Sequence, residues 1–250
     1  MKYVVYDLET ASLEGGICEF SVLFGDTKEP NKRHLESSLV YSPIPISYEA
    51  MGVHFITNED IQDKEDLNTI EEYIEFKSIV ENPKNLVIGF NIIDFDNKIL
   101  KNEQDIKFKC RILDVQKVVE HLRSKEFDET GESHWPDNIK LTTLWFMTGA
   151  YKKLEEHNFY IDKIIPHEGK SDVIMTYIVM KQIQKGYNIS IKEMIEFSNK
   201  PIIMKRFPVG KYKGQLIKDV IKKDKKYINW CVKEMEGDLT ESIKLELNKG

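Results

Sequence analysis

The alternation of apolar and polar residues predicts strands first, and then strands that alternate with helices. Runs of β-branched and aromatic residues, or a short continuous apolar run, indicate strands, whereas apolar residues three or four positions apart indicate helices. The five predicted strands cover residues 2–8, 17–24, 33–41, 85–90 and 108–113. The predicted helices cover residues 48–54, 68–80, 94–101, 115–122 and 169–185, and the second is expected to be capped by Asn68 or Thr69. This order favours an α/β domain with a mixed sheet.

Two later regions lack these regular patterns. Residues 123–138 are polar, contain Gly131 and Pro136, and are interpreted as a long surface loop. Beyond about residue 188 the chain changes to short lysine-rich helices. We therefore expect a main domain over residues 1–187 and a C-terminal extension over residues 188–250.

Charge is distributed unevenly between these parts. The chain of 250 residues has a formal net charge of −6, from 36 Lys+Arg and 42 Asp+Glu. Residues 201–250 contain 12 basic and 7 acidic residues, a net charge of +5, which leaves −11 for residues 1–200. An acidic body with a basic extension fits a metal-binding domain joined to a module that binds a polyanion. A solvated lysine-rich helical face would give the same charge pattern.

The sequence excludes several protein classes. No run of about 18 apolar residues occurs, so no membrane span is predicted. Carboxylates at Asp7 and Glu9 come too early for a signal peptide. Cys18, Cys110 and Cys231 are scattered and lack zinc-ligand spacing. An odd, scattered set of cysteines suggests reduced thiols and a cytoplasmic location.

Asp7 and Glu9 lie two residues apart at the end of the first predicted strand. The period of two directs both side chains to one face of the sheet. Carboxylates that face the same way repel, and a divalent cation relieves that repulsion. Acidic residues at strand ends are also commonly solvated, so this pair alone does not establish a metal site.

Two later segments add acidic residues and a histidine. An apolar strand runs into a turn at Asn91, and the next helix starts with Asp94 and Asp96. One of these aspartates could face the end of the first strand, or both could simply favour the helix dipole. His167 precedes the helix that contains Asp172, and a histidine on a flexible approach suits general-base chemistry near neutral pH. A lone histidine at this spacing is also common by chance.

Together, the three segments resemble the motifs of the DEDD superfamily of 3′→5′ exonucleases, in its histidine subclass. Residues 7–10 are similar to the first motif, residues 91–96 to the second and residues 167–172 to the third. Similarity to the exodeoxyribonuclease X family extends over most of residues 1–235, through residues 13–19, 45–57, 200–204, 207–214 and 227–230. The resemblance implies a ribonuclease H-like fold, with a mixed five-stranded sheet flanked by helices and a small basic C-terminal helical extension.

The second motif departs from the family pattern. The family usually places its aspartate four residues after the asparagine, and Phe95 occupies that position here. Matching Phe95-Asp96 to the family's Phe-Asp pattern selects Asp96 and implies one inserted residue, with Asp94 as the alternative. Phe90 stands where the family often has histidine, which puts a contact at that position in doubt.

By this resemblance, Asp7, Glu9, Asp96 and Asp172 bind two divalent ions, Mg²⁺ or Mn²⁺, and His167 accepts a proton from the attacking water. Oxygen ligands favour such hard cations over zinc. The implied reaction releases nucleoside 5′-monophosphates from single-stranded or duplex DNA 3′ ends, in a setting of DNA repair. The alternatives are a 3′→5′ exoribonuclease acting on RNA and a proofreading subunit that works with a polymerase.

The expected substrate contacts fall in two regions. Near the terminal nucleotide they are Thr10, Leu13, Met51, His54 and Asn91, although His54 is also a candidate for a purely structural role. In the extension they are Lys211, Tyr212 and Lys213, which could follow a phosphate backbone and stack a base. The extension could equally be a helical appendage that docks on the main domain through its aromatic residues, and both roles are compatible. These residues are Phe207, Tyr212, Tyr227 and Trp230.

Overall fold

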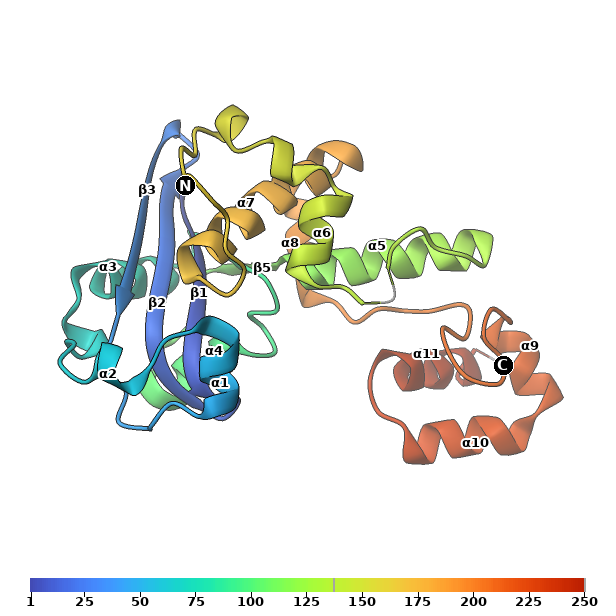
Figure 1. Ribbon diagram of the computed structural model, residues 1–250. Helices are drawn as coiled ribbons and strands as arrows, with labels where there is room; N and C mark the ends of the chain where they lie inside the picture. The colour runs from blue at the N-terminus through green and yellow to red at the C-terminus, as the bar shows by residue number, and fades with distance from the viewer. Residues whose placement is uncertain (137, 250) are drawn as a thin grey trace. The chain divides into compact units, whose positions relative to one another are not determined.

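The computed structural model describes residues 1–136 and 138–249, and these residues form two compact units. Unit 1 comprises residues 1–116 and 140–198, and unit 2 comprises residues 117–139 and 199–250. The division differs from the predicted one, because residues 117–139 belong with the C-terminal segment and residues 188–198 belong with the main domain. The separate functions expected for the main domain and the C-terminal extension stay a prediction. Figure 1 shows the elements of each unit.

Unit 1 is built on a five-stranded mixed sheet with the strand order β3-β2-β1-β4-β5. The strands are β1 (Lys2–Ser12), β2 (Gly15–Asp26), β3 (Glu29–Leu39), β4 (Leu86–Gly89) and β5 (Arg111–Asp114). β1, β2 and β3 pair antiparallel, whereas β4 pairs parallel with β1 and with β5. All five predicted strands are present, and the predicted fold class is confirmed.

β1 is longer than predicted, and this changes the setting of its carboxylates. The strand continues to Ser12 because its antiparallel pairing with β2 extends to Ser12 and Gly15. Asp7 and Glu9 therefore lie inside a strand rather than at its end. The parallel pairing with β4 stops earlier, at Val5 and Ile88. The carboxylates thus lie beyond the carboxyl end of β4, where one edge of β1 is open to other groups.

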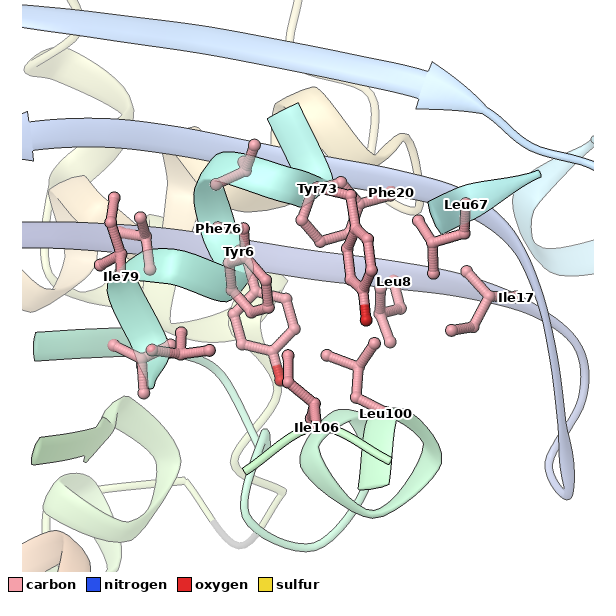
Figure 2. Close-up of a cluster of buried hydrophobic side chains, with 14 of the residues drawn as sticks. Tyr6, Leu8, Ile17, Phe20, Leu67, Tyr73, Phe76, Ile79, Leu100 and Ile106 are labelled. Carbon is pink, nitrogen blue, oxygen red and sulfur yellow. The ribbon is translucent and has the colours of Figure 1, made fainter. Parts of the chain in front are cut away.

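One face of the sheet packs on α3 (Glu71–Val80) and α4 (Asp96–Gln104) through a continuous apolar core. Tyr6, Leu8 and Phe20 point to this face, and Figure 2 shows them against side chains of these helices. The Tyr6 ring lies 4.9 Å from the Phe76 ring, and its hydroxyl donates to Asn97 Oδ1 at 2.7 Å. Since side chains alternate along β1, Asp7 and Glu9 must point to the opposite face.

The opposite face of the sheet packs on α7 (Gly169–Gly186). Tyr3 stacks on Tyr177 with ring centroids 6.4 Å apart. Arg33 on β3 donates to the Tyr177 hydroxyl at 2.9 Å and to the His157 carbonyl, and its guanidinium lies 5.3 Å from the Phe159 ring centroid. These contacts hold both α7 and the segment before it against the sheet.

The remaining elements of unit 1 are mostly short. They are α1 (Tyr48–His54), α2 (Asn58–Ile61), η1 (Leu67–Thr69), α6 (Leu141–Met147), η2 (Ala150–Lys152), η3 (Glu155–His157) and α8 (Ile191–Asn199). The helix predicted over residues 48–54 is confirmed. The predicted cap at Asn68 or Thr69 is wrong, because Asp66 caps η1 through the Asn68 N–H and α3 starts only after Ile70. Across residues 1–136 and 138–249, no helix has the length and apolar character needed to cross a membrane.

Unit 2 joins most of α5 (Val115–Thr130) to α9 (Ile217–Lys223), α10 (Lys225–Glu234) and α11 (Asp238–Leu247). The loop predicted over residues 123–138 is therefore wrong in its first half. Asp128 accepts hydrogen bonds from the backbone N–H groups of Lys205 and Arg206 at 2.8–3.0 Å, so the C-terminal segment fastens the end of this helix. The core of α9, α10 and α11 contains Phe207, Tyr212, Ile217, Val220, Ile228, Cys231, Leu239 and Ile243.

Candidate active site

The β1–β2 hairpin places three carboxylates on the face that meets α7. Asp7 lies opposite Ser21, and Glu9 lies opposite Glu19 in the antiparallel register. Residues directly opposite each other in such a pair point to the same face. Glu9 and Glu19 are both buried, at 9% and 8% exposure, and Asp7 is half-buried. Glu19 was not predicted as a site residue.

The second segment brings Asp96 to β1 and leaves Asp94 outside. The Leu8 N–H donates to Asp96 Oδ1 at 3.1 Å, and Asp96 is only 3% exposed. Asp94 is exposed and pairs with Lys98 at 3.4 Å. The geometry therefore favours Asp96 over Asp94 as the acidic residue of this segment.

A tight turn before α4 makes this choice possible. Asn91 adopts a left-handed backbone conformation with φ 61°, which asparagine tolerates better than most residues. The N–H groups of Asn91 and Ile93 each donate to the Asp114 carboxylate at 3.0 Å. Asp114 lies at the carboxyl end of β5 and is fully buried. The turn delays the start of α4 to Asp96, whereas the sequence predicted a start at residue 94.

The third segment forms a compact turn before α7. The His167 N–H lies 3.3 Å from both carboxylate oxygens of Asp172, and His167 has a left-handed φ of 63°. The Ser171 hydroxyl donates to Glu168 at 2.6 Å and accepts the Ile165 N–H at 3.0 Å. These bonds close the turn, with the His167 side chain exposed and the Asp172 carboxylate buried.

The four predicted carboxylates lie close enough to change one another's acidity. Burial, followed by the charges of Asp172 and Glu9, raises the pKa of Asp7 well above its usual range. Burial and then the Asp172 charge raise the pKa of Glu9 to about 9. Burial is also the main reason that the pKa of both Asp96 and Asp172 is raised to about 7. The site therefore concentrates negative charge at a cost that a bound cation would offset.

The donor groups are suitably placed for a divalent cation. Glu9, His167 and Asp172 each contribute one ligand atom, and these atoms all lie within 4.8 Å of one another. Asp7 lies two residues before Glu9 in β1, and Asp96 accepts the N–H of Leu8, the residue between them. Buried carboxylates that repel one another fit a hard cation such as Mg²⁺ or Mn²⁺.

The residues predicted to contact the terminal nucleotide differ in their exposure. Leu13 is 88% exposed at the tip of the β1–β2 hairpin, and Met51 is half-buried on α1. Thr10 is buried, and its hydroxyl donates to the Ser12 carbonyl at 2.8 Å. The His54 ring is also buried. Its Nδ1 accepts the Ile56 N–H at 3.0 Å, and its Nε2 lies 3.3 Å from the Thr10 carbonyl. Because Nδ1 accepts a hydrogen bond, Nε2 can donate to Thr10, and this geometry fits a structural role for His54; its contact with the terminal nucleotide stays a prediction.

In unit 2, the aromatic residue of the predicted backbone-binding segment is not available for stacking. Tyr212 is 5% exposed, packs against Phe207 and Tyr227, and donates its hydroxyl to Asp224 at 2.8 Å. The prediction that Tyr212 stacks a base is therefore corrected, because its ring lies in the core of the unit. Lys213 is exposed, and Lys211 pairs with Asp224 at 3.0 Å.

The sequence comparisons link almost the whole chain to one group of nucleases. Residues 210–236 match the family described as exodeoxyribonuclease X-like C-terminal. Exodeoxyribonuclease 10 of Escherichia coli K12 is 26% identical over 234 residues, which cover 93% of this chain and 91% of that protein. The resemblance to exodeoxyribonuclease X predicted from the motifs is confirmed.

Comparison with solved structures gives the same fold. Exonuclease X in complex with 5′ overhanging duplex DNA has a TM-score of 0.55 at 18% identity, covering 79% of this chain and 99% of that one. Escherichia coli exonuclease I in complex with a dA16 oligonucleotide has a TM-score of 0.53 at 15% identity. That match covers 78% of this chain but 42% of exonuclease I.

The two site residues that sequence reasoning missed are Glu19 and Gly169. Glu19 ends the segment 13–19 that resembles the family, but it lies in an apolar strand with no acidic residue among the next five, so it was not selected as a site residue. Its place in the site becomes visible only from the hairpin register that sets it opposite Glu9. Gly169 follows Glu168 and has the pattern of an ordinary helix start, although its backbone approaches β2 closely.

Proposed function

We propose that the protein is a metal-dependent 3′→5′ exodeoxyribonuclease that releases nucleoside 5′-monophosphates. The observation that carries this proposal is the meeting of acidic groups from three separate segments at β1. Asp7 and Glu9 lie on the strand, ligand atoms of His167 and Asp172 lie within 4.8 Å of one from Glu9, and Asp96 accepts the Leu8 N–H. The similarity to exodeoxyribonuclease 10 over 93% of the chain supports the substrate class. DNA in the exonuclease X and exonuclease I complexes supports it further.

Each group has a role that follows from its chemistry. The four carboxylates would hold two divalent cations, which stabilise the attacking and leaving oxygens of a phosphodiester during in-line displacement. His167 is exposed on a short turn and its backbone N–H is held by Asp172, and its imidazole would accept the proton of the attacking water. The contact between His54 and the Thr10 carbonyl would hold the end of β1, where the terminal nucleotide is expected to bind.

Unit 2 would supply sequence-independent affinity for the DNA backbone. Residues 201–226 contain nine Lys+Arg and two acidic residues, and Lys213, Lys218, Lys222, Lys225 and Lys226 are exposed. Lysines that neutralise phosphates release counterions and so add affinity that falls as salt rises. Since Tyr212 is buried, this contribution would be electrostatic rather than by stacking.

The experiment that tests the proposal uses single-stranded DNA, duplex DNA and RNA, each labelled at either the 3′ or the 5′ end. With Mg²⁺ we expect immediate release of labelled mononucleotide from 3′-labelled DNA and progressive shortening of 5′-labelled DNA, and no reaction in EDTA. Co-migration with 5′-monophosphate standards checks the product. His167→Ala and Asp7→Ala variants serve as controls that should be folded and inactive.

Other outcomes would revise the proposal in defined ways. Faster release from RNA would assign an exoribonuclease. Release first from 5′-labelled strands would reverse the direction. Folded protein that degrades none of the substrates in Mg²⁺ or Mn²⁺ would reject the activity of the isolated chain and point to a subunit that needs a polymerase.

A further inference from the structure

Glu19 occupies an unusual position for a buried carboxylate. It lies directly across the hairpin from Glu9, and like charges in such a cross-strand pair destabilise a sheet. Glu19 is nevertheless 8% exposed and keeps both carboxylate oxygens engaged. One oxygen accepts from the Ser37 hydroxyl at 2.5 Å, and the other accepts from the Gly169 N–H at 3.3 Å.

The Gly169 contact joins β2 to the turn that carries His167 and Asp172. Gly169 is the first residue of α7 and lies two positions after His167 and three before Asp172. A Cβ at Gly169 would lie 2.2 Å from Ser21 Oγ and 3.1 Å from Glu19 Oε2, so α7 meets β2 here without room for a side chain. The start of α7 is thus fixed by the hydrogen bond from Gly169 to Glu19.

A hydroxyl chain fixes Glu19 in turn. Ser21 donates to Ser37 at 2.8 Å, and Ser37 donates to Glu19. Because both oxygens are engaged, the carboxylate cannot rotate without breaking a bond. Glu19 therefore has the geometry of an outer partner of the site, a residue that orients the groups around it through hydrogen bonds.

We propose that Glu19 is a positioning residue that holds His167 and Asp172 in register with Glu9 through the Gly169 N–H. This role rests on the proposed exonuclease function. A side-chain amide could perform the same positioning role as the carboxylate, because a glutamine oxygen can still accept the Gly169 N–H. A direct cation ligand, in contrast, would lose most of its function on that change.

Glu19→Ala and Glu19→Gln separate these possibilities, with Glu29→Ala as a matched control that removes an exposed carboxylate from the far end of the β2–β3 hairpin. We expect Glu19→Ala to lower kcat by about 10–100-fold, the usual effect of losing an outer partner of a metal site. The kcat of Glu19→Gln should be at least about tenfold higher than that of Glu19→Ala. The control should behave as the unaltered protein.

Hydrogen exchange of residues 165–175 gives a second readout that is independent of turnover. In Glu19→Ala, with and without Mn²⁺, the Gly169 amide should exchange at least about tenfold faster, whereas Glu19→Gln should retain most of its protection. If Glu19→Ala fails to fold, Ser37→Ala provides the test, because it frees the carboxylate and should produce a smaller change of the same sign.

Several results would overturn the proposal. Equal loss of kcat in Glu19→Gln and Glu19→Ala, with normal protection of Gly169 in both, would make Glu19 a cation ligand instead. Unchanged exchange of the Gly169 amide and unchanged kcat in Glu19→Ala would show that Glu19 does not position the turn. Unaltered protein without nuclease activity would reject the proposed function, whereas the exchange comparison would still test whether Glu19 holds the turn.

Discussion

At the residue scale, Asp94 and Asp96 provide a matched pair of substitutions two positions apart. Asp96→Asn should lower kcat/KM by more than about a hundredfold, because losing a cation ligand should exceed the roughly 10–100-fold effect of losing an outer partner. Asp94→Asn should change it by less than about twofold, since Asp94 forms an exposed pair with Lys98. Steady-state kinetics on 3′-labelled DNA checks this, and the reverse ranking would assign Asp94 to the site.

The raised pKa values of the carboxylates predict how stability changes with pH without metal. Glu9, with a pKa of about 9, and Asp96 and Asp172, with pKa values of about 7, keep protons that the unfolded chain loses near pH 4. Between about pH 4 and 9 the folded state thus binds more protons, so the free energy of unfolding falls as pH rises.

In EDTA, the Tm should therefore decrease from pH 5.5 to 8.5, as measured by calorimetry. Mn²⁺ should raise the Tm more at pH 8.5 than at pH 5.5, because it binds the deprotonated carboxylates. A Glu9→Gln/Asp172→Asn double variant should have a weaker pH dependence in EDTA. A Tm that rises with pH in EDTA would contradict the expected protonation of these groups.

At the element scale, the close approach of α7 to β2 predicts different outcomes for two glycines of one helix. Gly169→Ala should lower the free energy of unfolding by about 1–3 kcal/mol, because the new methyl group would overlap Ser21. Gly186→Ala, at the other end of α7, meets nothing within 4 Å and should change stability by less than about 1 kcal/mol. Urea unfolding of both variants measures the difference, and equal effects would contradict the close packing.

The elements of unit 1 were largely predictable because their signals are local. Runs of β-branched, aromatic and other apolar residues located all five strands, and the apolar spacing of residues 169–185 located α7. Long-range partners decided what the sequence missed. The Asp114 carboxylate shapes the turn that delays α4, and hydrogen bonds from Lys205 and Arg206 hold the end of α5 in a segment rich in polar residues.

The candidate site follows the same division. Asp7, Glu9 and Asp172 could be selected from motifs, since each motif is a short run of neighbouring residues. The family's Phe-Asp pattern selected Asp96 and left Asp94 as the alternative, and the Leu8 N–H, 88 positions away in the chain, supplies the geometric reason to favour Asp96. Tyr212 was misassigned because an aromatic residue between two lysines has the same local pattern whether its ring is buried or exposed.

At the scale of the whole molecule, the lysines of unit 2 predict a salt dependence of DNA binding. Replacing Lys213, Lys218 and Lys222 with glutamine should reduce the slope of log K against log salt by up to about 0.9 for each phosphate of duplex DNA that is no longer neutralised. Replacing Lys28, Lys64 and Lys107 of unit 1, which are also exposed, provides a control of equal charge. Fluorescence anisotropy with a DNA duplex measures both sets, and equal slopes would argue against a role for unit 2.

The composition of unit 2 from two stretches of chain has a consequence for biosynthesis. α5 emerges from the ribosome long before residues 199–250, which complete its unit. The two stretches are separated by 199 − 139 = 60 positions, which correspond to roughly 3–12 seconds at a synthesis rate of about 5–20 residues per second. During that delay Asp128 lacks the backbone N–H groups of Lys205 and Arg206, so the end of α5 gains these hydrogen bonds only after the later stretch has begun to be made.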